Sequence, residues 1–164
     1  MYALDKIGFD FIEGFEKFVA KPYQDSAGIW TQGIGSTINM DTGQKVKPTD
    51  PPITYETAKR WKLAHIAKHT NPVILNLIKI QLNQNQYNAL ASFVYNCGGH
   101  YKSSNGKMVP YQLFDLINKR TEEGTLKAYW ENCAVTAGGK VLAGLQRRRK
   151  AEANLFFTKP LTTT

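Results

Sequence analysis

The sequence is poor in cysteine and has no long apolar run. Its two cysteines, Cys97 and Cys133, are too few for a disulfide scaffold and stand in no CxxC or Cys/His cluster, so we expect two free thiols. No stretch approaches about 18 uninterrupted apolar residues, which leaves no candidate for a membrane-spanning helix. Asp5, Lys6 and Asp10 occupy positions where a signal peptide would need an apolar core. These absences predict a protein that stays in the cytoplasm in which it is made until something releases it.

Acidic residues are also scarce, since 13 Asp and Glu stand against 21 Lys and Arg, for a formal net charge of +8 and a pI near 9.5. This excess favours an anionic partner, which could be nucleic acid, an anionic membrane or an acidic cell-wall polymer, and charge alone does not choose among them. The hydrophobic content of 42%, without repeats or low-complexity segments, is typical of a soluble globular chain.

Hydrophobic spacing predicts a series of helices with one β-hairpin near the start. Apolar residues three and four apart predict a first helix over 3–16, with Glu16 at its end. The turn residues "DSAG" between β-prone stretches predict a hairpin, with Asp25 entering the turn and Thr31 on the returning strand. Further helices are expected from the cap Thr54 to about His69, where Pro72 breaks the pattern; after the capping-box string "NQNQ" as far as Gly98; and over 113–118, 126–132 and 142–157.

This layout is that of an α+β protein, with a single domain over residues 1–164. Its parts are expected to be a hairpin-containing lobe at about 1–60, a mostly helical lobe at about 61–157 and a polar tail at 158–164. Two lobes joined in this way leave a cleft between them, where ligands commonly bind.

Two carboxylates and a hydroxyl in the first lobe suit the hydrolysis of a glycosidic bond. That reaction needs an acid to protonate the leaving oxygen, and a second carboxylate across the sugar to attack carbon or to activate water. Glu16 at a helix end and Asp25 in a turn stand in different environments, which lets one stay protonated while the other stays ionised. Thr31 adds a hydroxyl that can hold the attacking water. Each of these residue types is common on surfaces, so they identify no active site by themselves.

The string around these residues resembles the signature of the phage-type lysozymes, or endolysins, of glycoside hydrolase family 24. In "FEKFVAKPYQDSAGIWTQGIGST", the Phe-Glu pair, Tyr-x-Asp, the small-residue turn and Thr-x-Gly-x-Gly follow that pattern without a gap. "LNQNQYNALASFVYNCGG" is similar to the family's core helix, and "GGKVLAGLQRRRKAEANLF" to its closing segment. The resemblance implies a lysozyme-like fold, with Glu16 as proton donor, Asp25 as the carboxylate on the opposite face and Thr31 as its water-positioning partner.

The resemblance also implies an activity. The implied activity is that of a muramidase, which cleaves the β-1,4 bond from N-acetylmuramic acid to N-acetylglucosamine in bacterial peptidoglycan. The reaction would invert the anomeric configuration and would serve host lysis at phage release. A separate hole-forming protein would let the enzyme reach the wall. We expect no cofactor and no metal ion, and a monomer that neither binds nucleic acid nor inserts stably into a membrane.

Two alternatives stay open. One is a cationic protein that disrupts membranes through its arginine-rich last helix. The other is a lytic transglycosylase, which keeps Glu16 but needs no water activated by Asp25.

Substrate contacts are expected from two further places. Asn96, at the end of the core helix, can face the substrate or cap the helix. One arginine among residues 147–149 is expected to point into the cleft, toward Glu16 or toward acidic groups of the substrate, and Arg147 and Arg148 are the candidates. We also expect Arg148 to pair with Glu152, four residues on, at the surface.

Other charged residues are expected to have no part in the chemistry. His65 and His69 have metal-ligand spacing, but no third ligand stands nearby, so a solvated helix face is the expectation. Glu13 breaks the spacing to the second carboxylate and is assigned to the solvent face of the first helix. Lys17 and Ser36 stand where the family usually has glycine and often has histidine, and no role of that histidine is carried over to Ser36.

Overall fold

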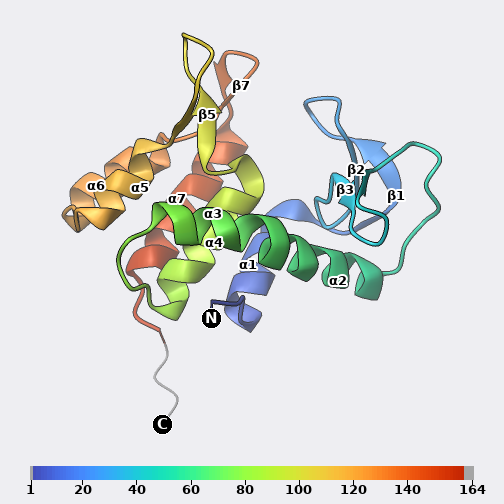
Figure 1. Cartoon of the computed structure of the whole chain (residues 1–164), viewed down its shortest axis with the longest axis horizontal. Helices are drawn as coiled ribbons and strands as arrows, with labels where there is room; N and C mark the ends of the chain where they lie inside the picture. Colours follow the sequence, from blue (N-terminus) through green and yellow to red (C-terminus); the bar gives the residue numbers. More distant parts are fainter. Residues whose placement is uncertain (1, 161–164) are drawn as a thin grey trace.

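The structure is a computed structural model that describes residues 2–160. Within that range, the strands pair two by two into antiparallel hairpins. In chain order, the elements drawn in Figure 1 are α1 (Lys6–Glu16), β1 (Val19–Gln24), β2 (Trp30–Gly33), β3 (Ile38–Asn39), β4 (Gln44–Lys45), α2 (Tyr55–His65), the π-helix η1 (Ile66–Thr70), α3 (Asn71–Leu77), α4 (Gln84–Cys97), β5 (His100–Lys102), β6 (Met108–Pro110), α5 (Gln112–Asn118), α6 (Glu123–Glu131), β7 (Thr136–Ala137), β8 (Lys140–Val141) and α7 (Ala143–Phe157).

The hairpin β1–β2 lies to one side of the helices, together with β3–β4, and α2 runs from this side toward the helical body (Figure 1). The predicted hairpin is confirmed, because Asp25 follows β1 directly and Thr31 on β2 stands opposite Tyr23. Helices and small antiparallel sheets are thus both present, as expected for an α+β fold.

One long helical run replaces the predicted break at Pro72. Thr54 caps α2 as expected, accepting from the Thr57 N–H, but the chain then continues through η1 into α3. In η1 the Asn71 N–H donates to the Ile66 carbonyl, five residues back, so the backbone is wider here than in an α-helix. Pro72 follows immediately, in the first turn of α3, so the N–H that proline lacks falls directly after the widened stretch.

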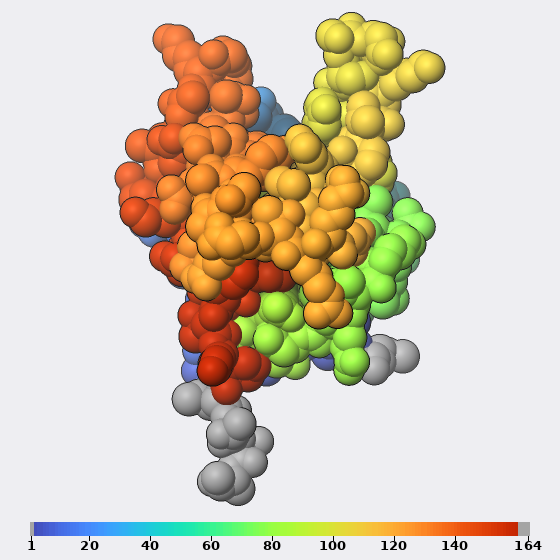
Figure 2. Space-filling model, turned by 90° about the vertical axis from the view of Figure 1, so that its left-hand side faces the viewer, coloured from blue at the N-terminus to red at the C-terminus, as the bar shows by residue number. Residues whose placement is uncertain are grey.

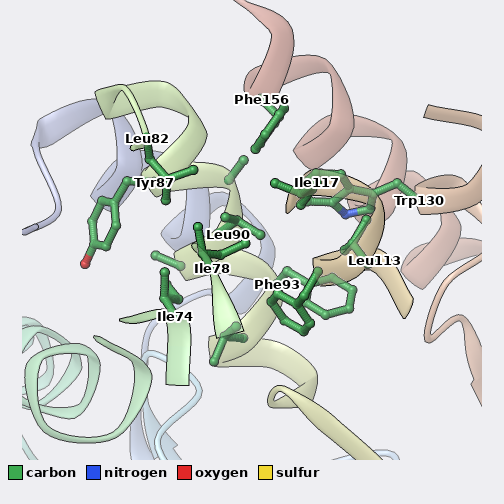
Figure 3. Packing of buried hydrophobic residues seen from close by; sticks show 14 of the residues in the cluster. Ile74, Ile78, Leu82, Tyr87, Leu90, Phe93, Leu113, Ile117, Trp130 and Phe156 are labelled. Atoms are coloured by element: carbon green, nitrogen blue, oxygen red, sulfur yellow. The ribbon is translucent and has the colours of Figure 1, made fainter. Parts of the chain in front are cut away.

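Helix α4 is the centre of the core, as its apolar sequence predicts. Its start carries the predicted capping box between Asn83 and Gln86, and it ends at Gly98, whose φ of +75° is accessible to glycine at little cost. It packs against α7, α1 and α3. Figure 3 shows the side chains that gather around it, among them Leu90, Phe93, Leu113, Ile117, Trp130 and Phe156, all at most 4% exposed.

Two further hairpins, β5–β6 and β7–β8, project in the same direction from the helical body, with a gap between them (Figure 2). The second matches the predicted turn at Gly138 and Gly139. The first corrects the prediction of a loop after the core helix: its tip contains Asn105-Gly106, and the Ser103 N–H donates to the Lys107 carbonyl at 2.9 Å. An Asn-Gly pair is a strong hairpin signal, and the polar residues around it hide that signal in the sequence.

No helix between residues 2 and 160 combines the length and the apolar character needed to cross a membrane.

Candidate active site

Glu16 is the last residue of α1, and an arginine from near the other end of the chain holds its carboxylate. The helix ends because Lys17 turns to φ +50°, while its N–H still donates to the Glu13 carbonyl at 3.1 Å. Arg148 of α7 donates from Nη1 to Oε1 of Glu16, whose side chain keeps 19% of its surface exposed. Arg148 thus holds one oxygen of the Glu16 carboxylate, while part of the side chain stays exposed.

Arg148 belongs to a buried cluster of charges. Its Nε donates to Oε1 of Glu152 at 3.3 Å, and Arg149 donates from Nη1 to Oε2 at 2.7 Å. Ser92 and Trp130 donate to the same carboxylate at 2.6 and 3.3 Å. Burial raises the pKa of Glu152 above its ordinary value, and the two guanidiniums oppose that rise.

The prediction that Arg148 and Glu152 pair at the surface is wrong. Their spacing correctly indicates a contact, but both side chains are buried, with 4% and 0% of their surfaces exposed. Both side chains are buried because α7, which carries them, packs against both α4 and α6. A buried pair also behaves differently from a surface pair, because removing one partner leaves an uncompensated charge inside the protein.

Asp25 is held by its own turn. Its Oδ1 accepts from the backbone N–H groups of Ala27 and Ile29, both at 2.9 Å, and its N–H donates to the Ile29 carbonyl at 3.0 Å. The Thr31 hydroxyl donates to that same carbonyl at 3.0 Å, and Thr31 is only 3% exposed. Gly28 completes the turn at φ +76°. Residues 25–31 therefore position the carboxylate and the hydroxyl with bonds inside one hairpin.

Gly35 brings the hairpin segment against Glu16. A Cβ at this position would lie 2.5 Å from Oε2 of Glu16, and the backbone has φ +74°. Both facts require glycine, the first because the space is taken and the second because left-handed backbone is unfavourable for other residues. The last glycine of the Thr-x-Gly-x-Gly string thus allows the chain after β2 to approach the acid.

The three predicted catalytic residues line one cleft of about 220 Å³. The complete set of side chains and glycines around it is Glu16, Tyr23, Asp25, Thr31, Gly35, Thr37, His65, Tyr95 and Asn96. A second cavity of about 600 Å³ adjoins this cleft and shares Glu16 and Asn96 with it; it is also lined by Phe15, Leu142, Arg147 and Arg148. Glu16 and Asn96 are therefore accessible from both cavities.

The three residues predicted to contact substrate lie in different environments. Asn96 lines both cavities, and its Oδ1 accepts from Nη2 of Arg149 instead of capping the helix. Arg148 binds Glu16 and Glu152 and is buried. Arg147 is exposed beside the second cavity, and within the described residues no ion pair engages it. Arg147 is therefore the arginine of this run with an accessible guanidinium.

Sequence reasoning missed two aromatic residues of the cleft, His65 and Tyr95. The solvated helix face predicted for "HIAKH" holds for His69, which is exposed, but is wrong for His65, which is half-buried in the cleft. The Tyr95 hydroxyl donates to the Ile34 carbonyl at 2.8 Å, and burial raises the pKa of Tyr95. The helical spacing could have placed both histidines on one side of a helix, but not against a cleft built by other segments.

Residues 2–160 contain no group of three or more His, Cys, Asp and Glu side chains arranged to hold a metal ion. The chemistry available in the cleft is that of two carboxylates on different elements, a threonine hydroxyl and an arginine that contacts one carboxylate. Such a set can move protons to and from a bound polar substrate.

Comparison with protein families gives a match to the phage lysozyme model over residues 13–152. An endolysin of Acyrthosiphon pisum secondary endosymbiont phage 1 is 33% identical over 150 residues, which cover 91% of this chain and 94% of the relative. A SAR-endolysin of Haemophilus phage HP1 is 30% identical over 149 residues, covering 88% of this chain and 75% of the relative.

Solved structures agree with this match. The endolysin from Escherichia coli O157:H7 phage FAHEc1 superimposes with a TM-score of 0.76 at 28% identity, covering 95% of this chain and 94% of that one. A P22 lysozyme mutant superimposes with a TM-score of 0.73 at 25% identity, covering 96% and 100%. The architecture in Figure 1 is thus the lysozyme-like α+β fold.

Proposed function

Since this chain belongs to the phage lysozyme family, we propose that it is a muramidase that hydrolyses the β-1,4 bond from N-acetylmuramic acid to N-acetylglucosamine in peptidoglycan. At the coarser level, it is a glycoside hydrolase of the lysozyme type that acts on bacterial peptidoglycan in host lysis. The observation that carries the finer proposal is the meeting of Glu16, Asp25 and Thr31 in one cleft.

In this mechanism Glu16 donates a proton to the glycosidic oxygen. Asp25 accepts a proton from the water that attacks the anomeric carbon, and Thr31 holds that water through its hydroxyl. The turn supports the role of Asp25, because both backbone N–H bonds go to Oδ1, leaving Oδ2 without a partner within the hairpin. Thr31 donates its only hydroxyl proton to Ile29, so its oxygen can accept a hydrogen bond from water.

The experiment that tests the mechanism is the clearing rate of purified peptidoglycan by Glu16→Gln and Asp25→Asn proteins. Each is expected to lose at least about 100-fold in rate, because each lacks one of the two proton-transfer groups. Asparagine at position 25 keeps an oxygen for the two N–H bonds, so the turn should survive. Glu13→Gln, on the same helix one turn earlier, is the matched control and is expected to clear at the wild-type rate. A folded Glu16→Gln protein with wild-type activity would exclude Glu16 as the acid.

The products distinguish the proposed chemistry from its alternatives. Inversion predicts a reducing end that appears first as the opposite anomer, which proton NMR detects during the reaction, and a carboxyl separation of about 6.5 to 9.5 Å. A lytic transglycosylase would form an anhydro sugar, seen by mass spectrometry, and would tolerate Asp25→Asn. A membrane-disrupting protein would still lyse cells as the Glu16→Gln variant.

The second cavity suggests where the substrate continues. We propose that Asn96 contacts the sugar chain near the cleaved bond, and that Arg147 attracts anionic groups of the wall at the far side of Glu16. Arg148 acts on the substrate through Glu16, which it positions. Because two carboxylates and water suffice for this reaction, we propose that the protein works without a cofactor. We also propose that it is a monomer that binds no nucleic acid, does not insert stably into a membrane and stays in the host cytoplasm until lysis.

A further inference from the structure

His65 is a polar residue of the cleft that the proposed mechanism leaves without a role. It ends α2 and lines the same cavity as Glu16 and Asp25. Its ring stands edge-on to the ring of Tyr95, with centroids 5.2 Å apart and an angle of 82° between the planes. The exposed ring of His69 also contacts it, with centroids 4.9 Å apart. The imidazole is therefore held by ring contacts, which leaves its nitrogens free of a structural task.

The imidazole of His65 is neutral at physiological pH. Burial lowers its pKa to about 4, and the neighbouring His69 adds to that effect. A neutral imidazole carries one N–H donor and one nitrogen acceptor, and neither hydrogen-bonds to another group in residues 2–160. The titratable groups that share its surroundings are Glu16 from α1, Tyr23 and Asp25 from the hairpin, Tyr95 from α4 and His69 from η1.

The two adjoining cavities indicate which part of the substrate meets His65. Glu16 lines both cavities, whereas Asp25 and His65 line only the smaller one. The acid protonates the oxygen of the cleaved bond, and the base lies across the sugar ring whose carbon is attacked. That ring consequently occupies the smaller cavity, between the two carboxylates and beside His65.

We propose that His65 binds the sugar whose anomeric carbon is attacked, by a hydrogen bond from its neutral imidazole to a hydroxyl or acetamido group of that ring. The proposal rests on the muramidase function proposed above. Hydrogen bonds to the reacting sugar strengthen as the ring distorts toward the transition state, so the contact acts on kcat more than on KM.

The test compares His65→Phe and His65→Gln with the wild type on soluble, peptide-free glycan chains. Phenylalanine keeps a flat ring against Tyr95 but has no hydrogen-bonding group, whereas glutamine keeps a donor and an acceptor. His65→Phe is expected to lose about tenfold in kcat/KM, mostly in kcat, the effect of one hydrogen bond. His65→Gln is expected to retain most of the activity, and the control His100→Gln, at the start of β5 and outside the cleft, all of it.

A second measurement works without any change at position 65. Titrating the Glu16→Gln protein with the same glycan chains is expected to shift the imidazole NMR signals of His65 and to leave those of His100, outside the cleft, in place. Wild-type kinetics in His65→Phe, or a His65 signal that stays in place, would overturn the proposal and leave the muramidase function intact. If the wild type does not cleave peptidoglycan at all, the function itself fails, and with it the proposal for His65.

Discussion

The turn that carries Asp25 is built from bonds inside residues 25–29, whereas Glu16 depends on Arg148, 132 residues away in the sequence. The hairpin is partly exposed, and its bonds are ordinary backbone contacts. The support of Glu16 is buried, charged and shared with Glu152, which is 0% exposed. The two carboxylates of one cleft are therefore held by different kinds of interaction.

These two kinds of support are expected to respond differently to substitutions. A local turn tolerates changes elsewhere, because its geometry follows from a few neighbouring residues. A buried ion cluster couples several helices, so a single change affects both stability and the position of Glu16. Substitutions in the buried cluster are therefore expected to have larger effects than substitutions at the surface or at the junction with the hairpin.

Glu152→Gln removes the shared negative charge under Arg148 and Arg149. We expect a loss of about 3 to 5 kcal/mol in the free energy of unfolding, because the buried guanidinium of Arg149 loses its ion-pair partner and that of Arg148 keeps only Glu16. Urea unfolding at neutral pH measures it. The control is Glu123→Gln, which breaks the more exposed pair with Lys127 and should change the stability by less than about 1 kcal/mol. Equal effects of the two changes would remove the contrast between buried and surface pairs.

Lys62→Met tests a buried charge that has no partner. Lys62 is 0% exposed, its Nζ makes no hydrogen bond within the described chain and lies 4.4 Å from the Phe9 ring centroid, and burial lowers its pKa to about 8. Below pH 8 the folded and unfolded states are both protonated, so methionine is expected to add about 2 to 3 kcal/mol of stability there.

The stability gained by Lys62→Met is expected to depend on pH. Between pH 8 and the ordinary pKa of 10.5, the unfolded state binds more protons, so the wild type gains stability as pH rises and the advantage of methionine shrinks. Unfolding free energies at pH 7 and pH 10 measure this change. Lys59→Met is the control, because Lys59 lies over the same Phe9 ring but is exposed. An advantage of Lys62→Met that is independent of pH would contradict the assignment.

Lys17→Gly acts at the junction between Glu16 and the hairpin. Lys17 has φ +50° and ψ 152°, a conformation that is unfavourable for a residue with a side chain. Glycine, which the family usually has here, should add about 1 kcal/mol of stability after its greater freedom in the unfolded chain is subtracted. Thermal unfolding measures the gain. Lys21→Gly inside β1 is expected to destabilise instead, and a gain at both positions would point to lost charge repulsion as the cause.

The elements that could be predicted from the sequence are those built from neighbouring residues. The capping box of α4, the Thr54 cap, the end of α1 at Glu16 and the turn at Asp25 all use contacts within four residues, which spacing and residue type reveal directly. The grouping of Glu16, Asp25 and Thr31 was predicted through the family resemblance, since nothing in their spacing shows that a helix end and a hairpin meet.

Tertiary packing alone decided the rest. Arg148 and Glu152 carry the same spacing whether they lie in water or in the core, and only the packing of α7 against α4 and α6 buries them. His65 and His69 are one turn apart on the same helical run, yet the cleft makes one a lining residue and leaves the other exposed. Local geometry follows from the sequence, because short-range hydrogen bonds depend on adjacent residues. Burial, and with it the strength and role of each charge, depends on segments that are distant in the chain.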